Sequence, residues 1–356
     1  MKAFGFLSFG HYGHVRGSQT PDAASALKQS VEIGVGADEI GVNGAYFRVH
    51  HFERQLSSPL VLLSTIAART RHIEVGTGVI DMRYENPLHL AEDLGALDLL
   101  SDRRIAIGIS RGSPETAVRG YEAFGYTGAQ DPRGADIARA KFATFLEAIG
   151  GEGMVDADPQ RAVPGTRLRI EPRSAGLRDR IWWGSGTRET AEWVGRLGLN
   201  LMSSTLLTEE NGATFAELQR EQIDRFRAAY VAAGHTGHPR VSVSRSIFPI
   251  VDERDAAYFG AAARDSDQVG IIDGYRSTFG RTYADTPDKL ITQLRDDAAV
   301  MAADTVMLTI PNQLGVDYNL HVLQAFAEHV APSLGWRPNT AGPVQGDDPA
   351  DGQVSV

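Results

Sequence analysis

Residues 72–110 read HIEVGTGVIDMRYENPLHLAEDLGALDLLSDRRIAIGIS, and this stretch decides the fold. It opens with a β-branched run at 72–79, continues through a segment of helical period near 86–100, and closes with a second apolar run at 104–110. A strand, a helix and a second strand in this order predict a βαβ unit with parallel strands and helices covering the sheet.

The same unit repeats along most of the chain. Strands are predicted at residues 3–8, 39–42, 72–79, 104–110, 181–184, 200–203, 241–247 and 305–310. Helices are predicted near residues 22–35, 58–69, 86–100, 134–149, 187–197, 212–233, 287–302 and 316–331. Eight strands, each followed by a helix, predict an α/β fold of the (β/α)8 TIM-barrel type.

Two connections are longer than the usual loop of ~2 to 6 residues. Residues 111–180 follow the fourth strand and residues 248–286 follow the seventh, so both insertions lie at the edge where a barrel keeps its active site. We expect one domain over residues 1–334. Residues 335–356 are rich in Pro, Gly, Asp and Gln and are predicted to form a mobile tail.

Composition excludes several functional classes. The 356 residues are 42% hydrophobic and contain neither an apolar run of ~18 residues nor a signal-peptide start, so we expect a cytoplasmic protein that does not enter membranes. A net charge of -10 disfavours nucleic acid as a partner. The absence of cysteine removes thiolate chemistry, and a redox enzyme of this composition must borrow its electron carrier.

The carboxyl ends of barrel strands place the chemistry, and here they contain few carboxylates. The predicted ends read Phe9, Val42-Asn43, Gly78-Val79, Ser110-Arg111, Gly184-Ser185, Ser203-Ser204 and Pro311-Asn312. This set disfavours a metal site. The chain has only four lysines and none follows a strand, which disfavours Schiff-base chemistry. Glycine, hydroxyls, one arginine and histidines remain, a set suited to a flat cofactor with a phosphate.

The segment 184–187, Gly-Ser-Gly-Thr, connects an apolar strand to a predicted helix. Its Ser185, Gly186 and Thr187 bring free amides and the positive end of the helix dipole to one point, which favours a phosphate. An ordinary N-cap is the alternative. A dinucleotide fingerprint is disfavoured because Glu189 replaces its third glycine. Arg111 could close the phosphate site from the other side, or lie in solvent at the rim.

A pair of histidines, His50 and His51, follows the predicted second strand and the aromatic run Tyr46-Phe47. One ring could exchange a proton with a substrate or flavin while the other packs. A purely structural role for either histidine is the alternative.

Taken together, these residues resemble the bacterial luciferase-like flavin monooxygenase family, from Met1 to about Leu334. The resemblance rests on the order and spacing of many short pieces. They are residues 2–6, 50–52, 58–59, 67–70, 75–79, 86–87, 91–93, 104–108, 110–112, 124–125 and 181–198.

The resemblance assigns roles to individual residues. It implies that His50 lies near the reactive edge of the flavin, with His51 as its companion, and that Arg111 binds the flavin phosphate. It implies a non-proline cis peptide between Gly78 and Val79 beneath the flavin ring. The residues that would complete the phosphate site are Gly186, Thr187 and Thr190.

Two positions depart from the family pattern. Val49 stands where the family usually has a glutamate before the histidine pair, which changes the electrostatics there. Ser110 stands where luciferase itself has a cysteine, which argues against transferring aldehyde oxidation and light emission to this chain.

The resemblance implies a flavin-dependent oxidoreductase, a monooxygenase that uses reduced FMN and O2 on a small organic substrate, with a separate flavin reductase. It also implies a homodimer through helices 58–69 and 86–100. We expect an apolar or mildly polar substrate, because aromatic and methionine side chains can line the mouth, namely Phe9, Tyr46, Phe47, Phe52 and Met82. The alternatives are deazaflavin-dependent hydride transfer, a non-catalytic flavin-binding protein, and a barrel hydrolase.

Overall fold

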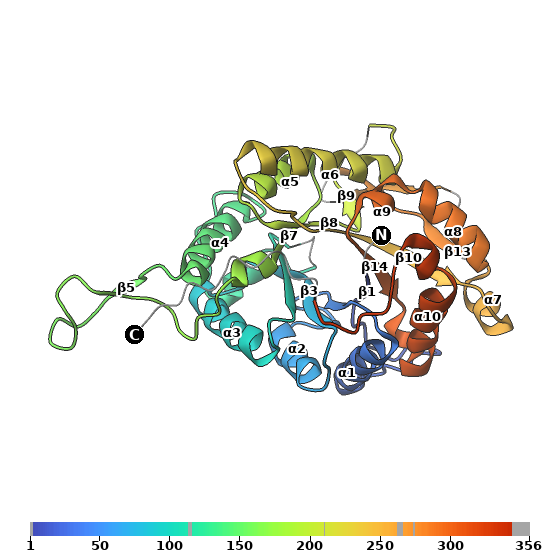
Figure 1. Cartoon of the computed structure of the whole chain (residues 1–356), viewed down its shortest axis with the longest axis horizontal. Coiled ribbons are helices and arrows are strands. Elements are labelled where there is room, and N and C mark those ends of the chain that lie inside the picture. The colour runs from blue at the N-terminus through green and yellow to red at the C-terminus, as the bar shows by residue number, and fades with distance from the viewer. Residues whose placement is uncertain (1–2, 113–115, 210, 262–265, 273–274, 344–356) are drawn as a thin grey trace.

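A closed barrel of eight parallel strands forms the centre of the molecule (Figure 1). The computed structural model describes residues 3–112, 116–209, 211–261, 266–272 and 275–343. The barrel strands are β1 (Ala3–Ser8), β2 (Gly44–Phe47), β3 (Glu74–Asp81), β4 (Ile105–Ser110), β7 (Ile181–Ser185), β8 (Asn200–Ser203), β10 (Val241–Pro249) and β14 (Thr305–Ile310). Strand β1 pairs with β14, and β8 pairs with β10, so the ring is closed. The predicted TIM barrel is confirmed.

Helices surround the barrel and join its strands (Figure 1). The main ones are α1 (Ala23–Ile40), α2 (Pro59–Ala67), α3 (Pro87–Leu100), α4 (Ala135–Gly150), α5 (Arg188–Arg196), α6 (Phe215–Ala232), α8 (Pro287–Asp296) and α10 (Val316–His329). The predicted helix 287–302 is broken at Asp297. Its carboxylate accepts the amides of Ala299 and Val300 and so starts a separate short helix, α9 (Ala298–Ala302).

The second predicted strand, at 39–42, is wrong. These residues complete α1, which buries Ile33 and Ala37 and ends at Gly41, a glycine with φ 87° that few other residues adopt. The strand itself begins at Gly44, so its carboxyl end moves from Val42-Asn43 to Phe47. This shift brings Arg48 to the edge of the barrel where active sites form.

The third strand is longer than predicted. Strand β3 continues to Asp81, and its pairing with β4 shifts register between Thr77 and Ile80. The peptide between Gly78 and Val79 in this bulge is cis, as predicted. Since Asp81 is the last residue of the strand, a buried carboxylate stands at a strand end that we predicted to carry none.

Both predicted insertions are present. The insertion after β4 contains two short 3-10 helices, η1 (Gly120–Phe124) and η2 (Leu177–Arg180). Between them, the paired short strands β5 (Val155–Asp156) and β6 (Arg167–Leu168) project from the barrel near α4 (Figure 1). After β10 come α7 (Glu253–Phe259), β11 (Gln268–Ile272), β12 (Tyr275–Phe279) and β13 (Thr282–Asp285). Strand β12 pairs with β9 (Leu206–Leu207), which joins the loops that follow β8 and β10.

The end of the described chain packs under the barrel. After the turns η3 (Asn312–Leu314) and η4 (Ala331–Leu334), the buried Trp336 donates its indole N–H to Asn43 Oδ1 at 2.7 Å and packs on the Phe4 ring. The amide of Asn339 donates to the Gly41 carbonyl. Residues 335–339, which we assigned to the tail, therefore lie on the domain. Of the predicted tail, residues 344–356 lie outside the described residues.

The amino-terminal end of the barrel is filled by large side chains. Tyr46 lies over Gly44 and Gly76, where a Cβ would come within 2.9 Å of its ring. Its hydroxyl donates to Glu74, and burial raises the pKa of Tyr46. Arg240 pairs with Glu74 through both terminal guanidinium nitrogens, at 2.7 and 2.8 Å.

No helix in the described part of the chain is both long and apolar enough to cross a bilayer.

Candidate active site

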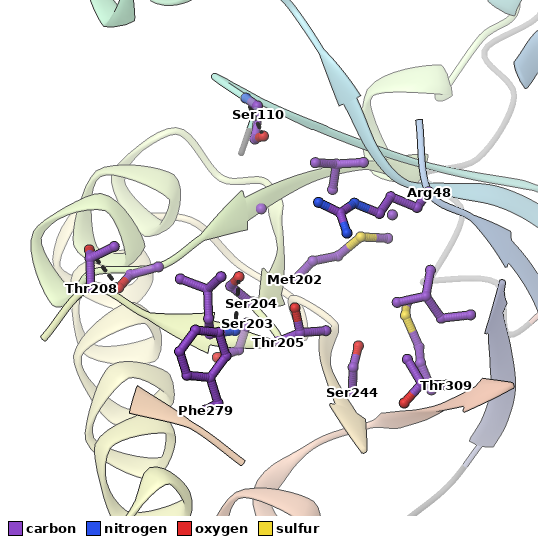
Figure 2. Close-up of a pocket in the computed structure, with 18 of the residues that line it drawn as sticks. Arg48, Ser110, Met202, Ser203, Ser204, Thr205, Thr208, Ser244, Phe279 and Thr309 are labelled. Carbon is purple, nitrogen blue, oxygen red and sulfur yellow. Dashed lines mark hydrogen bonds between the residues drawn. The ribbon is translucent and has the colours of Figure 1, made fainter. Parts of the chain in front are cut away.

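A cavity of about 980 Å³ occupies the carboxyl end of the barrel (Figure 2). All eight barrel strands or the residues directly after them contribute to its wall, as do the loops at 131–139, 204–209 and 279–281. Its volume is at the upper end of the ~300–1,000 Å³ range of small-molecule sites. The cavity therefore has room for a cofactor and a substrate together.

The bulge of β3 forms one wall of the cavity. Gly78 and Val79 line it, and the Val79 side chain covers Gly108 and Gly184 on the neighbouring strands. A Cβ at Gly108 would lie 2.9 Å from a Val79 methyl group, and one at Gly184 would lie 3.1 Å away. Glycines at these positions let the valine side chain lie close to the strands, which keeps the wall flat.

The segment after β7 forms a second wall. Thr187 caps α5 by accepting the amide of Thr190, and its hydroxyl also donates to the Thr190 hydroxyl at 3.0 Å. Ser185 lies directly behind, with its hydroxyl donating to the Thr187 carbonyl at 2.8 Å. Gly186, Thr187 and Thr190 line the cavity, so the ordinary cap and the proposed phosphate cradle are the same structure.

Three arginines line the same cavity. Arg111 lines the cavity directly after β4, and Arg133 and Arg139 line it from the loop and first turn of α4. Ser110 accepts the amide of Gly112 with its hydroxyl at 2.8 Å, which turns the chain at the strand end. A dianion at this point would meet permanent cations as well as helix amides.

The other end of the wall holds His50. It lines the cavity, it is buried, and its amide donates to the Leu56 carbonyl at 2.9 Å. Burial and the nearby Arg48 guanidinium hold the pKa of His50 below its usual value. The ring is therefore neutral at neutral pH and can accept a proton or donate one.

His51 faces away from the cavity. Its ring stacks on Tyr84 with centroids 4.1 Å apart and meets Phe124 edge-on at 5.4 Å. Burial lowers the pKa of His51. These aromatic contacts agree with a structural role for His51.

Eight of the ten residues predicted for the site line the one cavity. They are His50, Gly78, Val79, Ser110, Arg111, Gly186, Thr187 and Thr190. Ser185 supports Thr187 from behind, and His51 packs among aromatic rings.

Sequence reasoning missed several polar residues in the wall, among them Arg48 and Asp81. Arg48 was missed because the second strand was placed too early. Asp81 was missed because β3 was ended too early, and its carboxylate forms a close pair with Arg83 Nη2 at 2.6 Å. An arginine directly after an apolar strand, as in Phe47-Arg48, was the available signal for the first.

The aromatic mouth was predicted only in part. Phe9 lines the cavity, whereas Tyr46, Phe47 and Met82 are fully buried in the core. Phe52 is exposed beside Phe124. The side chains that replace them in the wall are Leu7, Met202, Phe248, Phe279 and Met307.

The donors in the cavity fit a flat group that carries a phosphate. The hydroxyls of Thr187 and Thr190 and the guanidinium of Arg111 suit the phosphate, and the glycine wall at Gly78 and Gly184 leaves room for a ring system. Fold and cavity together place the chain among the barrel enzymes that build their sites at the strand carboxyl ends.

A family model described as luciferase-like monooxygenase matches residues 1–303. The chain belongs to this family. It is 22% identical over 217 residues to the alkanal monooxygenase alpha chain of the Kryptophanaron alfredi symbiont, which covers 60% of this chain and 57% of that one. It is 35% identical over 96 residues to the uncharacterized protein YwcH of Bacillus subtilis, covering 26% of this chain and 29% of that one. The chain thus spans well under two thirds of these relatives.

Solved structures share the fold over almost the whole chain. The monooxygenase RslO1 from Streptomyces bottropensis superposes with a TM-score of 0.69 and 21% identity, covering 93% of this chain and 99% of that one. The oxygenating constituent of 3,6-diketocamphane monooxygenase from Pseudomonas putida, in complex with FMN, superposes with a TM-score of 0.70 and 15% identity. The superposition covers 94% of this chain and 98% of that one. A coenzyme F420-dependent tetrahydromethanopterin reductase from Methanopyrus kandleri gives 0.62 and 14%, covering 94% and 99%.

Proposed function

We propose that the chain is a monooxygenase that uses reduced FMN and O2 to oxidise a small organic substrate, with reduced FMN delivered by a separate flavin reductase. The observation that carries this proposal is the convergence of Arg111, the start of α5 and His50 on one cavity. Membership of the luciferase-like monooxygenase family supports the oxygenase chemistry.

The electron balance of this reaction is simple. Reduced FMN, when bound, supplies two electrons and two protons, so that one atom of O2 enters the substrate and the other leaves as water. The chain lacks a dinucleotide fingerprint at its glycine-rich strand end, which agrees with delivery of the reductant by another protein.

The residues of this chain bind, orient and exchange protons. Arg111 and the hydroxyls of Thr187 and Thr190 would hold the phosphate of a bound flavin, and this would orient the cofactor in the cavity. His50, whose ring is neutral at neutral pH, would accept or return a proton in the same cavity.

The same cavity places apolar side chains beside the polar groups. Leu7, Val79 and Met202 line it, and so does Phe279 from the insertion after β10 (Figure 2). An apolar wall strengthens the electrostatic effect of each polar group beside it.

A deazaflavin in place of FMN is the alternative cofactor, since one structural relative is a coenzyme F420-dependent reductase. Titration of the protein with FMN and with the deazaflavin, followed by absorbance, separates the two. We expect FMN to bind, and photoreduced FMN to consume O2 faster when an accepted substrate is added. Binding of the deazaflavin alone, or reduction of a substrate without O2 consumption, would contradict the proposal.

We also propose a cytoplasmic homodimer through α2 and α3. In the single chain, Val61 and Leu100 are 72% and 78% exposed on these helices. Exposed apolar side chains in adjacent helices are typical of a subunit contact. Light scattering at micromolar concentration should give twice the 38.5 kDa chain mass, and a monomer mass would rule this contact out.

A further inference from the structure

Among the described residues, arginines outnumber carboxylates in the cavity wall, although the chain as a whole is acidic. In the part of the chain that the structure describes, the wall carries six arginines and four carboxylates, in a protein of net charge -10. These are Arg48, Arg111, Arg133, Arg139, Arg245 and Arg281 against Asp81, Asp131, Glu189 and Glu209. Such a field favours anions inside the cavity.

The arginines fall into distinct places. Arg111, Arg133 and Arg139 come from β4 and the segment leading into α4, on the side of the phosphate cradle. Arg245 is held by Asp297 through a two-point pair at 2.8 and 3.0 Å, so its charge is balanced within the fold. Arg48 comes from β2, which the strand order separates from the cradle strand β7 by β3 and β4.

Several contacts fix the position of Arg48. Its amide donates to the Ser8 carbonyl at 2.9 Å, and its guanidinium carbon lies 4.9 Å from the centre of the Phe9 ring. Figure 2 shows the guanidinium extending into the cavity beside Met202. The side chain is half-buried, and stacking on an aromatic ring holds the planar fork in one orientation.

The wall on this side of the cavity combines hydroxyls with apolar groups. Ser244, Ser246 and Thr309 line it, and the last two share a hydrogen bond at 3.0 Å. Leu7 and Met307 lie among them. A ligand in this region would meet apolar surface and hydroxyls, with the charge of Arg48 at one end.

We propose that Arg48 binds an anionic group of the substrate, so that the substrate class is a largely apolar molecule with a carboxylate. This inference rests on the proposed function. A planar guanidinium matches the two oxygens of a carboxylate through two parallel hydrogen bonds, and the apolar side chains of Leu7 and Met307 suit the rest of the molecule. The apolar or mildly polar substrate that we expected from the sequence would not use the charge of Arg48.

The test uses the protein saturated with FMN, so that the phosphate cradle is filled. Equilibrium dialysis measures the affinity for 2-naphthoate and for 2-naphthylmethanol, which differ in the anionic group. We expect the parent to bind the naphthoate more tightly. Arg48→Met should weaken naphthoate binding about ten- to a hundredfold, as for the loss of a charge-assisted hydrogen bond, and leave the alcohol within about twofold. The naphthoate affinity of Arg48→Lys should lie between those of the parent and Arg48→Met.

Arg220→Met is the matched control, since it removes an arginine from the exposed surface of α6. It should leave both affinities unchanged. Unchanged binding of the alcohol shows that the variant cavity is intact. Equal affinities of the parent for the two probes would overturn the inference, and so would a loss of FMN affinity in Arg48→Met as large as that in Arg111→Ala. A parent that does not bind FMN would instead defeat the proposed function.

Discussion

The two ends of the barrel use the same kinds of residue in opposite ways. At the amino-terminal end, Arg240 is locked to Glu74 by two hydrogen bonds and lies over the ring of the buried Trp182, with its guanidinium carbon 4.8 Å from the centre. At the carboxyl end, Arg48 lies over Phe9 in a similar way but faces a large cavity.

The glycines also have different roles at the two ends of the barrel. At the amino-terminal end, Gly44 and Gly76 leave space that the Tyr46 ring occupies. At the carboxyl end, Gly78 and Gly184 leave a wall open to a ligand. An arginine over an aromatic ring therefore pairs with a buried carboxylate at one end of the barrel and lines a large cavity at the other.

The largest expected effect of a substitution is at the carboxyl end. His50→Ala should lower turnover by about 10²- to 10⁴-fold, the usual contribution of a positioned proton-transfer group, with little change in stability. Stopped-flow and steady-state kinetics with reduced FMN measure it. His51→Ala is the paired control, because its stacking on Tyr84 predicts a smaller change in rate and a larger loss of stability. Equal rates for the His50 variant and the parent would remove His50 from the mechanism.

A substitution at the other end should act on stability alone. Arg240→Met leaves Glu74 buried without its ion-pair partner, and breaking such a pair typically lowers the free energy of unfolding by about 3 kcal/mol or more. Urea denaturation measures the loss. The exposed pair broken by Arg220→Met should change it by less than about 1 kcal/mol. A similar small change at Arg240 would mean that the two ends do not differ in this way.

The third effect is on cofactor affinity. Arg111→Ala should weaken FMN binding by about one to two orders of magnitude, because charge-assisted bonds contribute roughly 1.5 to 3 kcal/mol each. The urea midpoint should stay close to that of the parent. Flavin titration that gives one affinity for both proteins would show that the phosphate lies elsewhere.

The smallest effect concerns the pH dependence of the rate. The pKa of His50 is held down by burial and by Arg48, so the neutral ring persists to lower pH than usual and is lost only as the pH falls further. Arg48→Met removes the charge repulsion and should move the acid limb of the rate profile to higher pH. An acid limb that stays in place would show that another group controls it.

The barrel could be predicted because its signal is local and repeated. Apolar runs and helical periods alternate eight times, and seven of the eight predicted strands overlap observed ones. The second failed because the β-branched Ile40 and Val42 at a helix end also suit a strand. Whether these residues end a helix or form a strand depends on the packing of Ile33 and Ala37 against the rest of the protein, and on Gly41.

The site was predictable where its residues follow a strand directly and form a recognisable group, as for Arg111 and the segment 184–187. Arg48 needed the true end of β2, and its position over Phe9 exists only once β1 and β2 are paired. The pairing of β9 with β12 joins segments about 70 positions apart, both too short to carry a periodic pattern.

The packing of Trp336 has a consequence for biosynthesis. Phe4 in the first strand contacts Phe326 and Trp336, and β1 pairs with β14, so its final partners are the last part of the domain to leave the ribosome. At ~5–20 residues per second, more than 300 residues of elongation take roughly 15 to 70 s. Throughout this interval the apolar stretch Ala3–Ser8 lacks its native neighbour on one side, and a growing chain in that state is a natural client for ribosome-associated chaperones.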